Sequence, residues 1–264
     1  MPSIDANATD THQPDQKTDE LMHRLEELET RLSLVTVELD ALYKEMDDLA
    51  RFLSHDLRAP LRGIDGYSAA LMEDYGAKLD PMGLAYLQYI AEAGRQAAYL
   101  IDRLIYFIRV QQADMHLQTI NLSQLALDLA KELSKSQPDR NISWVITPDL
   151  ILEGDFRMIQ ELLSILLENA WKFTGRHAAA RVEVGQVQIG DQAVFFVNDN
   201  GAGFNMDYQD QLFLPFHRLH NGHDFEGVGI GLAIARRIIQ RHQGRIWGEG
   251  KIDHGATFYF TIKG

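Results

Sequence analysis

The residues of this chain best suited to chemistry are a histidine and the acid that follows it. His55 and Asp56 lie in a stretch of helical periodicity, with His55 two residues from both Leu53 and Leu57. Two residues span about 200° around a helix, so the imidazole is expected to point away from the leucine face into water. An exposed imidazole beside a carboxylate can act as a nucleophile or general base, because the carboxylate fixes the ring proton on one nitrogen. Taken alone, the pattern also fits a solvated surface histidine.

The segment 168–174, Glu-Asn-Ala-Trp-Lys-Phe-Thr, ends a helix that is predicted to be capped by Gly154-Asp155. Asn169 falls opposite much of the apolar run in this helix. Its carboxamide oxygen can ligate Mg2+, which prefers oxygen ligands. Lys172 can reach phosphate as a point charge. An ordinary polar helix end remains the alternative interpretation.

Asp199 follows the apolar strand residues 193–197 and begins the segment Asp-Asn-Gly-Ala-Gly-Phe. An ionised carboxylate at the end of a buried strand is costly unless it finds hydrogen-bond donors. The exocyclic amine of adenine is a suitable donor, whereas guanine presents a carbonyl at that position. Gly201 and Gly203 allow the backbone to turn and to approach a ligand closely. A simple hairpin turn of the Asp-Asn-Gly type is the alternative.

The third segment contains Gly227, Gly229 and Gly231 and opens a helix predicted over 230–243. Backbone amides at a glycine-rich helix N-terminus bind phosphate oxygens. No strand of the dinucleotide-binding type immediately precedes these glycines, which argues against a Rossmann fold. The residues 213–218 before them are predicted to form a hinge, and 219–226 a mobile lid. His217, His220 and His223 are not expected to form a metal site, because no carboxylate-rich surroundings are evident.

A leucine heptad precedes His55 and predicts a coiled coil over 18–53. The step from Leu53 to Leu57 is four residues where three are due, and Pro60 removes the backbone hydrogen bond to the carbonyl of Asp56. We therefore expect an irregular, kinked helix beside His55. A turn is predicted over 76–83, and an apolar face from Leu84 to residue 108 predicts a second helix. Two antiparallel helices with one apolar face each bury it best in a dimeric four-helix bundle.

After residue 111 the pattern changes to alternating strands and helices, which predicts an α+β sandwich with one sheet covered by helices. Strands are expected at 116–120, 142–147, 181–189, 192–198, 244–249 and 256–262. Helices are expected at 122–136, 155–173 and 230–243. The predicted parts are thus a disordered tail over 1–17, the coiled coil over 18–53, a helical hairpin over 54–113 and the sandwich over 114–264.

Composition limits the function classes. The net charge of the 264 residues is -13, and residues 1–50 hold 13 acidic and 4 basic side chains, so -9 comes from this segment. No basic stripe is present, and nucleic acid is not an expected partner. The chain has no cysteine, which suits a reducing cytoplasm and excludes disulfides and thiolate metal sites. No apolar run is long enough for a membrane span.

The motifs, in this order, resemble the sensor histidine kinase family, and most of all its phytochrome-related branch. The resemblance covers a dimerisation and phosphoacceptor domain at 45–112 and an ATP-binding domain of the gyrase and heat-shock 90 type at 117–264. It implies that ATP phosphorylates His55, and that the phosphoryl group passes to an aspartate of a response-regulator receiver domain. The implied catalytic residues are His55, Asp56 and Glu168. The implied residues for ATP are Asn169, Lys172, Asp199, Gly201, Gly203, Phe213, Phe216, Arg218, Gly227, Gly229, Gly231 and Leu232, with Asn169 also the Mg2+ ligand.

Two residues depart from the family pattern. Val228 stands where many members have a hydroxyl residue, which predicts a lost phosphate contact. Ala59 stands where members with strong phosphatase activity carry Thr or Asn. No sensor domain is recognisable, so the coiled coil is expected to connect to an upstream sensor domain or protein. The alternatives are an ATPase or serine kinase that shares only the nucleotide fold, and a dimeric scaffold with a vestigial site.

Overall fold

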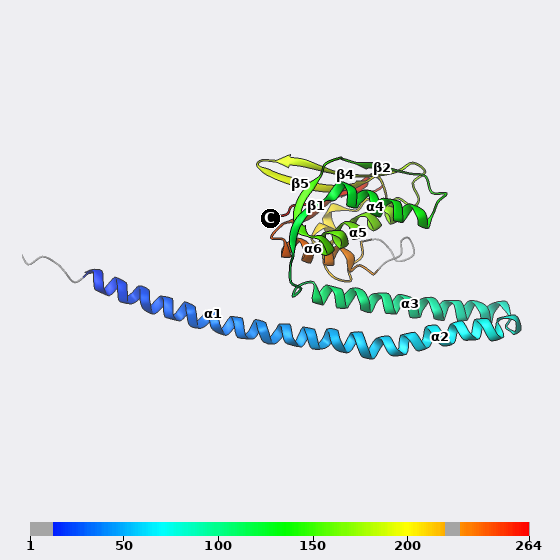
Figure 1. Ribbon diagram of the computed structural model, residues 1–264, viewed down its shortest axis with the longest axis horizontal. Coiled ribbons are helices and arrows are strands. Elements are labelled where there is room, and N and C mark those ends of the chain that lie inside the picture. Colours follow the sequence, from blue (N-terminus) through cyan, green and yellow to red (C-terminus); the bar gives the residue numbers. More distant parts are fainter. Residues whose placement is uncertain (1–12, 220–227, 264) are drawn as a thin grey trace, which may run out of the picture. The chain divides into compact units, whose positions relative to one another are not determined.

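The computed structural model describes residues 13–219 and 228–263 (Figure 1). It divides into two compact units, residues 1–49 and residues 50–264, which we describe separately. The segment 1–12 of the predicted tail lies outside the described residues.

Helix α1 (Gln13–Phe52) forms the first unit, and its last residues, 50–52, are counted with the second unit. The helix begins five residues before the expected start at Thr18, because Pro14 falls in its first turn, where the missing amide hydrogen has no helical partner. The leucines of the predicted seam are exposed along the helix; Leu32 is 68% and Leu39 is 45% exposed. Among the described residues, no helix is both long and apolar enough to cross a membrane.

The irregularity expected beside His55 is a π-helical turn, Leu53–Leu57 (η1). A π turn takes in one residue more than an α turn and occurs where the α-helical hydrogen-bond ladder is interrupted. Pro60 interrupts it here, since it cannot donate to the carbonyl of Asp56. The position of this turn matches the heptad stutter between Leu53 and Leu57.

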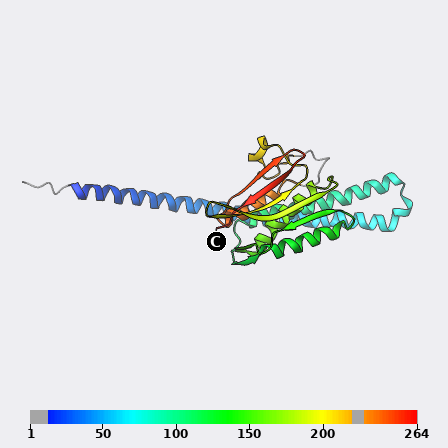
Figure 2. The same ribbon diagram turned by 90° about the horizontal axis from the view of Figure 1, so that it is seen from above.

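Two long helices follow η1 and pack side by side in both views (Figure 2). Helix α2 is Arg58–Tyr75, a short 3-10 turn is Gly76–Lys78 (η2), and helix α3 is Pro81–Arg109. Helix α3 begins three residues before Leu84, inside the segment predicted as a turn. Asp80 caps it by accepting a hydrogen bond from the Gly83 amide at 2.7 Å, and Pro81 occupies the first helical position.

The α2–α3 hairpin is held by close packing and by ion pairs. Gly94 is buried, and a Cβ there would lie 3.2 Å from Ile64 Cγ2, so the glycine allows the two helices to approach closely. Arg58 donates from Nε and Nη2 to Asp102 Oδ1 at 2.9 and 2.5 Å. This pair ties the residue after η1 to the C-terminal third of α3.

The remaining residues form an α+β sandwich, as predicted. A five-stranded sheet has the order β2-β4-β5-β7-β6, in which β2 and β4 are parallel and the other pairs antiparallel. The strands are β2 (Ile142–Ile146), β4 (Ala180–Ile189), β5 (Gln192–Asp199), β6 (Ile246–Lys251) and β7 (Gly255–Phe260). Helices α4 (Leu122–Ser136), α5 (Phe156–Phe173) and α6 (Gly231–Arg241) enclose an apolar core with the sheet.

One strand was missing from the sequence prediction. Strand β3 (Ile151–Asp155) pairs with β1 (Leu117–Asn121) in a separate two-stranded antiparallel sheet. Its last two residues had been interpreted only as the cap of α5, and Asp155 does both: it ends β3 and accepts hydrogen bonds from the amides of Arg157 and Met158.

Helix α6 binds the backbone that connects the hairpin to the sandwich. Arg241 donates from Nη1 to the Gln111 carbonyl at 2.5 Å and from Nη2 to the Ala113 carbonyl. Arg237 donates to the Phe107 carbonyl at 2.6 Å, and its guanidinium lies 3.6 Å from the centre of the Phe107 ring. These contacts fix the end of α3 against α6.

Candidate nucleotide site

A cavity of about 240 Å³ lies among α5, the loop after β5, the N-terminus of α6 and helix α3. The structure brings most of the residues predicted from the sequence to its wall. These are Glu168, Asn169, Lys172, Asp199, Gly203, Arg218, Gly229, Gly231 and Leu232. The three sequence segments with predicted ligand-binding residues therefore meet at one place.

Helix α5 presents its polar C-terminal end to the cavity. Its apolar side is buried in the core, while Asn169 and Lys172 are half-buried and Glu168 is exposed. Glu168 accepts a hydrogen bond from the Ser164 hydroxyl at 2.8 Å. Burial and, secondarily, the positive charge of Arg218 lower the pKa of Lys172 to about 8. A phosphate bound nearby would stabilise the charged form of this lysine and raise its pKa again.

Asp199 ends β5 and lies on the cavity wall with only 3% of its surface exposed. Burial raises its pKa to about 6, against hydrogen bonds from backbone amides that lower it. One of these donors is the Gly201 amide, at 2.8 Å from Oδ1. Gly201 does not line the cavity; its contribution is to orient the carboxylate that does.

Two glycines hold the loops of the site in conformations that a side chain would prevent. Gly203 has φ +59°, and a Cβ there would lie 2.0 Å from the Lys251 carbonyl oxygen. Gly229 has φ +76°, and a Cβ there would lie 2.5 Å from the His217 carbonyl oxygen. Both residues therefore require glycine for space as well as for backbone angle.

The chemistry of the wall fits a magnesium nucleotide. The carboxamide of Asn169 and the carboxylate of Glu168 are oxygen donors of the kind that Mg2+ takes. Lys172, Arg218 and the glycine-rich start of α6 suit phosphate, and the buried carboxylate of Asp199 suits an amine of a base.

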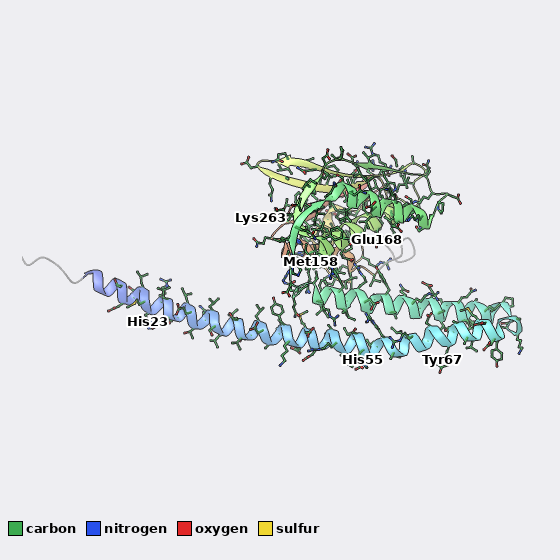
Figure 3. All side chains as sticks on the ribbon, viewed as in Figure 1. His23, His55, Tyr67, Met158, Glu168 and Lys263 are labelled. Atoms are coloured by element: carbon green, nitrogen blue, oxygen red, sulfur yellow. The ribbon has the colours of Figure 1, made fainter. Side chains whose placement is uncertain are left out.

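The histidine singled out from the sequence lies on η1, apart from the elements of the sandwich (Figure 3). Its side chain is 91% exposed, and Nδ1 lies 2.7 Å from Asp56 Oδ1. An ionised carboxylate can only accept, so with it Nδ1–H donates in this contact and the lone pair lies on Nε2. The exposure is the one expected from the helical spacing, and the contact is with the acid that follows His55 in the sequence.

Some predicted residues do not line the cavity. Phe213 lines a separate cavity between the 3-10 turn η3 (Met206–Gln211) and β6, because its ring packs toward the core edge there. Phe216 is 55% exposed and has φ +62°, and its amide donates to the Gly229 carbonyl at 2.9 Å. Its backbone thus positions the glycine loop, while its ring does not reach the cavity. Gly227 lies outside the described residues.

Sequence reasoning also missed residues on the cavity wall. Tyr99 and Arg103 line it from α3, which the sequence shows only as an amphipathic helix of the hairpin. Other polar residues on α3, such as Glu92 and Arg95, show the same character, so nothing in the sequence singles out these two. The described residues contain no histidine and acid cluster able to hold a metal; His220 and His223 lie outside them.

Comparison with known families accounts for both parts of this arrangement. The His Kinase A phosphoacceptor domain matches residues 45–113. The histidine kinase-, DNA gyrase B- and HSP90-like ATPase matches residues 154–264. The first range contains η1 with His55, and the second contains every residue of the cavity wall except Tyr99 and Arg103.

Two curated relatives are phytochromes of a Nostoc species. The chain is 34% identical to cyanobacterial phytochrome B over 235 residues, which cover 88% of this chain and 31% of that protein. It is 31% identical to cyanobacterial phytochrome A over 236 residues, which cover 88% of this chain and 30% of that protein. The chain thus spans about a third of the length of these relatives.

Among solved structures, full-length ShkA in complex with AMPPNP has a TM-score of 0.63 and 25% identity, covering 81% of this chain and 45% of that one. The similarity extends beyond either domain alone. With both domain families matched in this order, and with phytochromes among its relatives, the chain belongs to the histidine kinase family.

Proposed function

We propose that this chain is the ATP-dependent kinase core of a two-component system, which phosphorylates its own His55 and passes the phosphoryl group to an aspartate of a response-regulator receiver domain. The observation that carries this proposal is the exposed His55–Asp56 pair in a chain that also holds a nucleotide-type cavity. The alternative, a solvated surface histidine without a function, gives no role to the carboxylate that contacts Nδ1.

In this reaction the Nε2 lone pair of His55 attacks the γ-phosphorus of ATP. The new N–P bond forms as the bond from the γ-phosphorus to the bridging oxygen breaks, and ADP leaves. Asp56 holds the Nδ1 proton during the attack and stabilises the positive ring that results. Asn169 and Glu168 would hold Mg2+, which supplies charge neutralisation to the phosphates when bound.

Within the sandwich, Asp199 accepts from the adenine amine and Lys172 and Arg218 contact the phosphates. The glycine loops keep the backbone close to the nucleotide, with Gly229 and Gly231 offering amides at the start of α6. Phosphoryl transfer needs little covalent assistance, so positioning and charge account for most of the proposed rate gain.

We also propose that the active form is a homodimer. The exposed seam of α1 contains Leu21, Leu25, Leu28, Leu32, Val35, Leu39, Leu42 and Leu49. Burial of each such side chain against a second copy is worth about 1.5–3 kcal/mol, which favours a parallel coiled coil. The coiled coil over 18–53 would connect an upstream sensor to the hairpin of 54–113, and the sandwich of 114–264 would supply the nucleotide.

The proposal is tested by labelling with γ-labelled ATP. We expect His55→Gln to abolish labelling and to leave ATP binding unchanged, because residue 55 does not line the cavity. His254→Gln is the matched control, since this histidine is also exposed and should label as wild type. Asn169→Ala should abolish labelling through loss of Mg2+. The label should be acid-labile and base-stable, and should move to a purified receiver domain.

Labelling of the His55 variant at the wild-type rate would contradict the phosphoacceptor assignment. A base-labile, acid-stable label would indicate a serine or threonine kinase instead. Failure of the wild-type chain to bind ATP would favour the scaffold alternative. Val228 on the cavity wall is consistent with that alternative, because it has no hydroxyl to contact phosphate.

A further inference from the structure

The wall of the nucleotide cavity is completed by the hairpin. Tyr99 and Arg103 lie one helical turn apart on α3 and face the end of α5 that carries Glu168 and Asn169. Burial raises the pKa of the Tyr99 hydroxyl. Neither residue belongs to the domain that provides the rest of the wall.

Arg103 has donor capacity that its protein contacts do not use. Its Nη1 donates to Glu161 on α5, and the side chain is only 17% exposed. Its Nε is enclosed by protein and makes no hydrogen bond to any described residue. A buried donor without an acceptor costs about 1–3 kcal/mol, so the protein leaves this guanidinium incompletely satisfied. A ligand would reach the part of Arg103 that lines the cavity.

The surroundings of Arg103 select the kind of acceptor. Lys172 and Arg218 line the same cavity, and their charges repel one another enough to contribute to the lowered pKa of Lys172. Three cations therefore share a small cavity with the carboxylates of Glu168 and Asp199. Such a group is stabilised by a ligand with several negative charges, and a planar guanidinium matches the geometry of phosphate oxygens.

Arg103 is also connected to the phosphoacceptor turn. The preceding residue, Asp102, accepts two hydrogen bonds from Arg58, three residues after His55. One turn of α3 thus contacts the segment that carries His55 on one side and the nucleotide cavity on the other.

We propose that Arg103 binds the polyphosphate of ATP in this cavity, so that α3 of the hairpin supplies part of the nucleotide site. The proposal rests on the proposed function, because it takes ATP as the nucleotide. Arg103 acts as a positioning residue: by contacting the phosphates it holds the hairpin, and through Asp102 and Arg58 the turn of His55, against the loaded sandwich.

The test compares ATP dissociation constants of the full chain by calorimetry. We expect Arg103→Gln to weaken ATP binding by roughly tenfold, the loss of one charged hydrogen bond. Glu161→Gln should bind ATP as well as wild type or more tightly, because it releases Arg103 from its protein partner. Arg95→Gln is the matched control, since Arg95 is an exposed arginine on the same helix and pairs with Glu92 away from the cavity.

A loss of affinity in the Arg103 variant without a loss in the Glu161 variant separates ligand binding from a structural ion pair. Equal losses in both variants, or wild-type affinity in Arg103→Gln, would overturn the proposal. Circular dichroism checks that each variant folds. If Arg103→Gln unfolds, Arg103→Lys replaces it in the test. We expect this variant to lose part of the affinity, because lysine keeps the positive charge but lacks the planar guanidinium that binds two phosphate oxygens. Wild-type ATP binding without labelling of His55 would refute the proposed function and leave this inference standing.

Discussion

The affinity for adenine should depend on the protonation of Asp199. Burial raises the pKa of this carboxyl from its ordinary value of 3.8 to about 6, and only its ionised form accepts well from the adenine amine. With a pKa of about 6, the ionised fraction falls from about nine-tenths at pH 7 to about one-tenth at pH 5. We therefore expect affinity to fall roughly tenfold over this range.

The assay is the dissociation constant of adenosine at stepped pH, since adenosine carries no phosphate that titrates in this range. Asp199→Asn is the control, because it keeps the size of the side chain and removes the titrating group. Its affinity should be low and flat between about pH 7 and about pH 5. A wild-type affinity that stays constant over the same range, or an Asp199→Asn profile as steep as that of wild type, would refute the assignment of Asp199 to adenine.

Stability of the ligand-free protein should show the opposite trend. Because the folded state raises the pKa of Asp199, the folded chain binds more protons than the unfolded chain between about pH 4 and about pH 6. The contribution of this group to the free energy of unfolding therefore increases as pH falls through that window. The difference between wild type and Asp199→Asn in urea unfolding at each pH isolates this contribution.

Three further predictions concern other parts of the chain. Leu39→Glu should weaken self-association, whereas Leu34→Glu, on an exposed position outside the seam, should not; molar mass across dilution checks this, and equal behaviour would argue against the seam. The chain should be a poor phosphatase because exposed Ala59 has no donor or acceptor for a water; decay of a phosphorylated receiver should accelerate in Ala59→Asn but not in Ala69→Asn, and fast decay with wild type would contradict this. Gly203→Ala should destabilise far more than Gly190→Ala, because both have φ +59° but only Gly203 lacks space for a Cβ; similar urea midpoints would refute the clash.

The sequence predicted best what depends on short segments. The segments around Asn169, Asp199 and Gly229 each carry their own chemistry, and the sheet only had to bring them together. The same holds for His55, whose exposure follows from helical spacing and whose acid partner is the next residue in the sequence. These features are local, so a single sequence suffices to find them.

Features that depend on packing between distant segments were not predicted. Tyr99 and Arg103 acquire their position from the docking of α3 beside α5, and nothing in the spacing of α3 indicates which neighbour it meets. Phe213 was assigned to the nucleotide by resemblance, but its ring packs elsewhere. Strand β3 is five residues long and its last residue is also the cap of α5, so its own sequence pattern does not indicate a strand. It is recognised only by its pairing with β1.

The contacts of Arg241 have a consequence for how the connecting segment tolerates change. Its acceptors are the main-chain carbonyls of Gln111 and Ala113, which every amino acid possesses. Substitutions at these two positions should leave the acceptors in place, so correlated variation between the side chains would not reveal this pairing. An inserted or deleted residue, by contrast, would move both carbonyls out of reach. The connection between hairpin and sandwich is therefore insensitive to composition and sensitive to length.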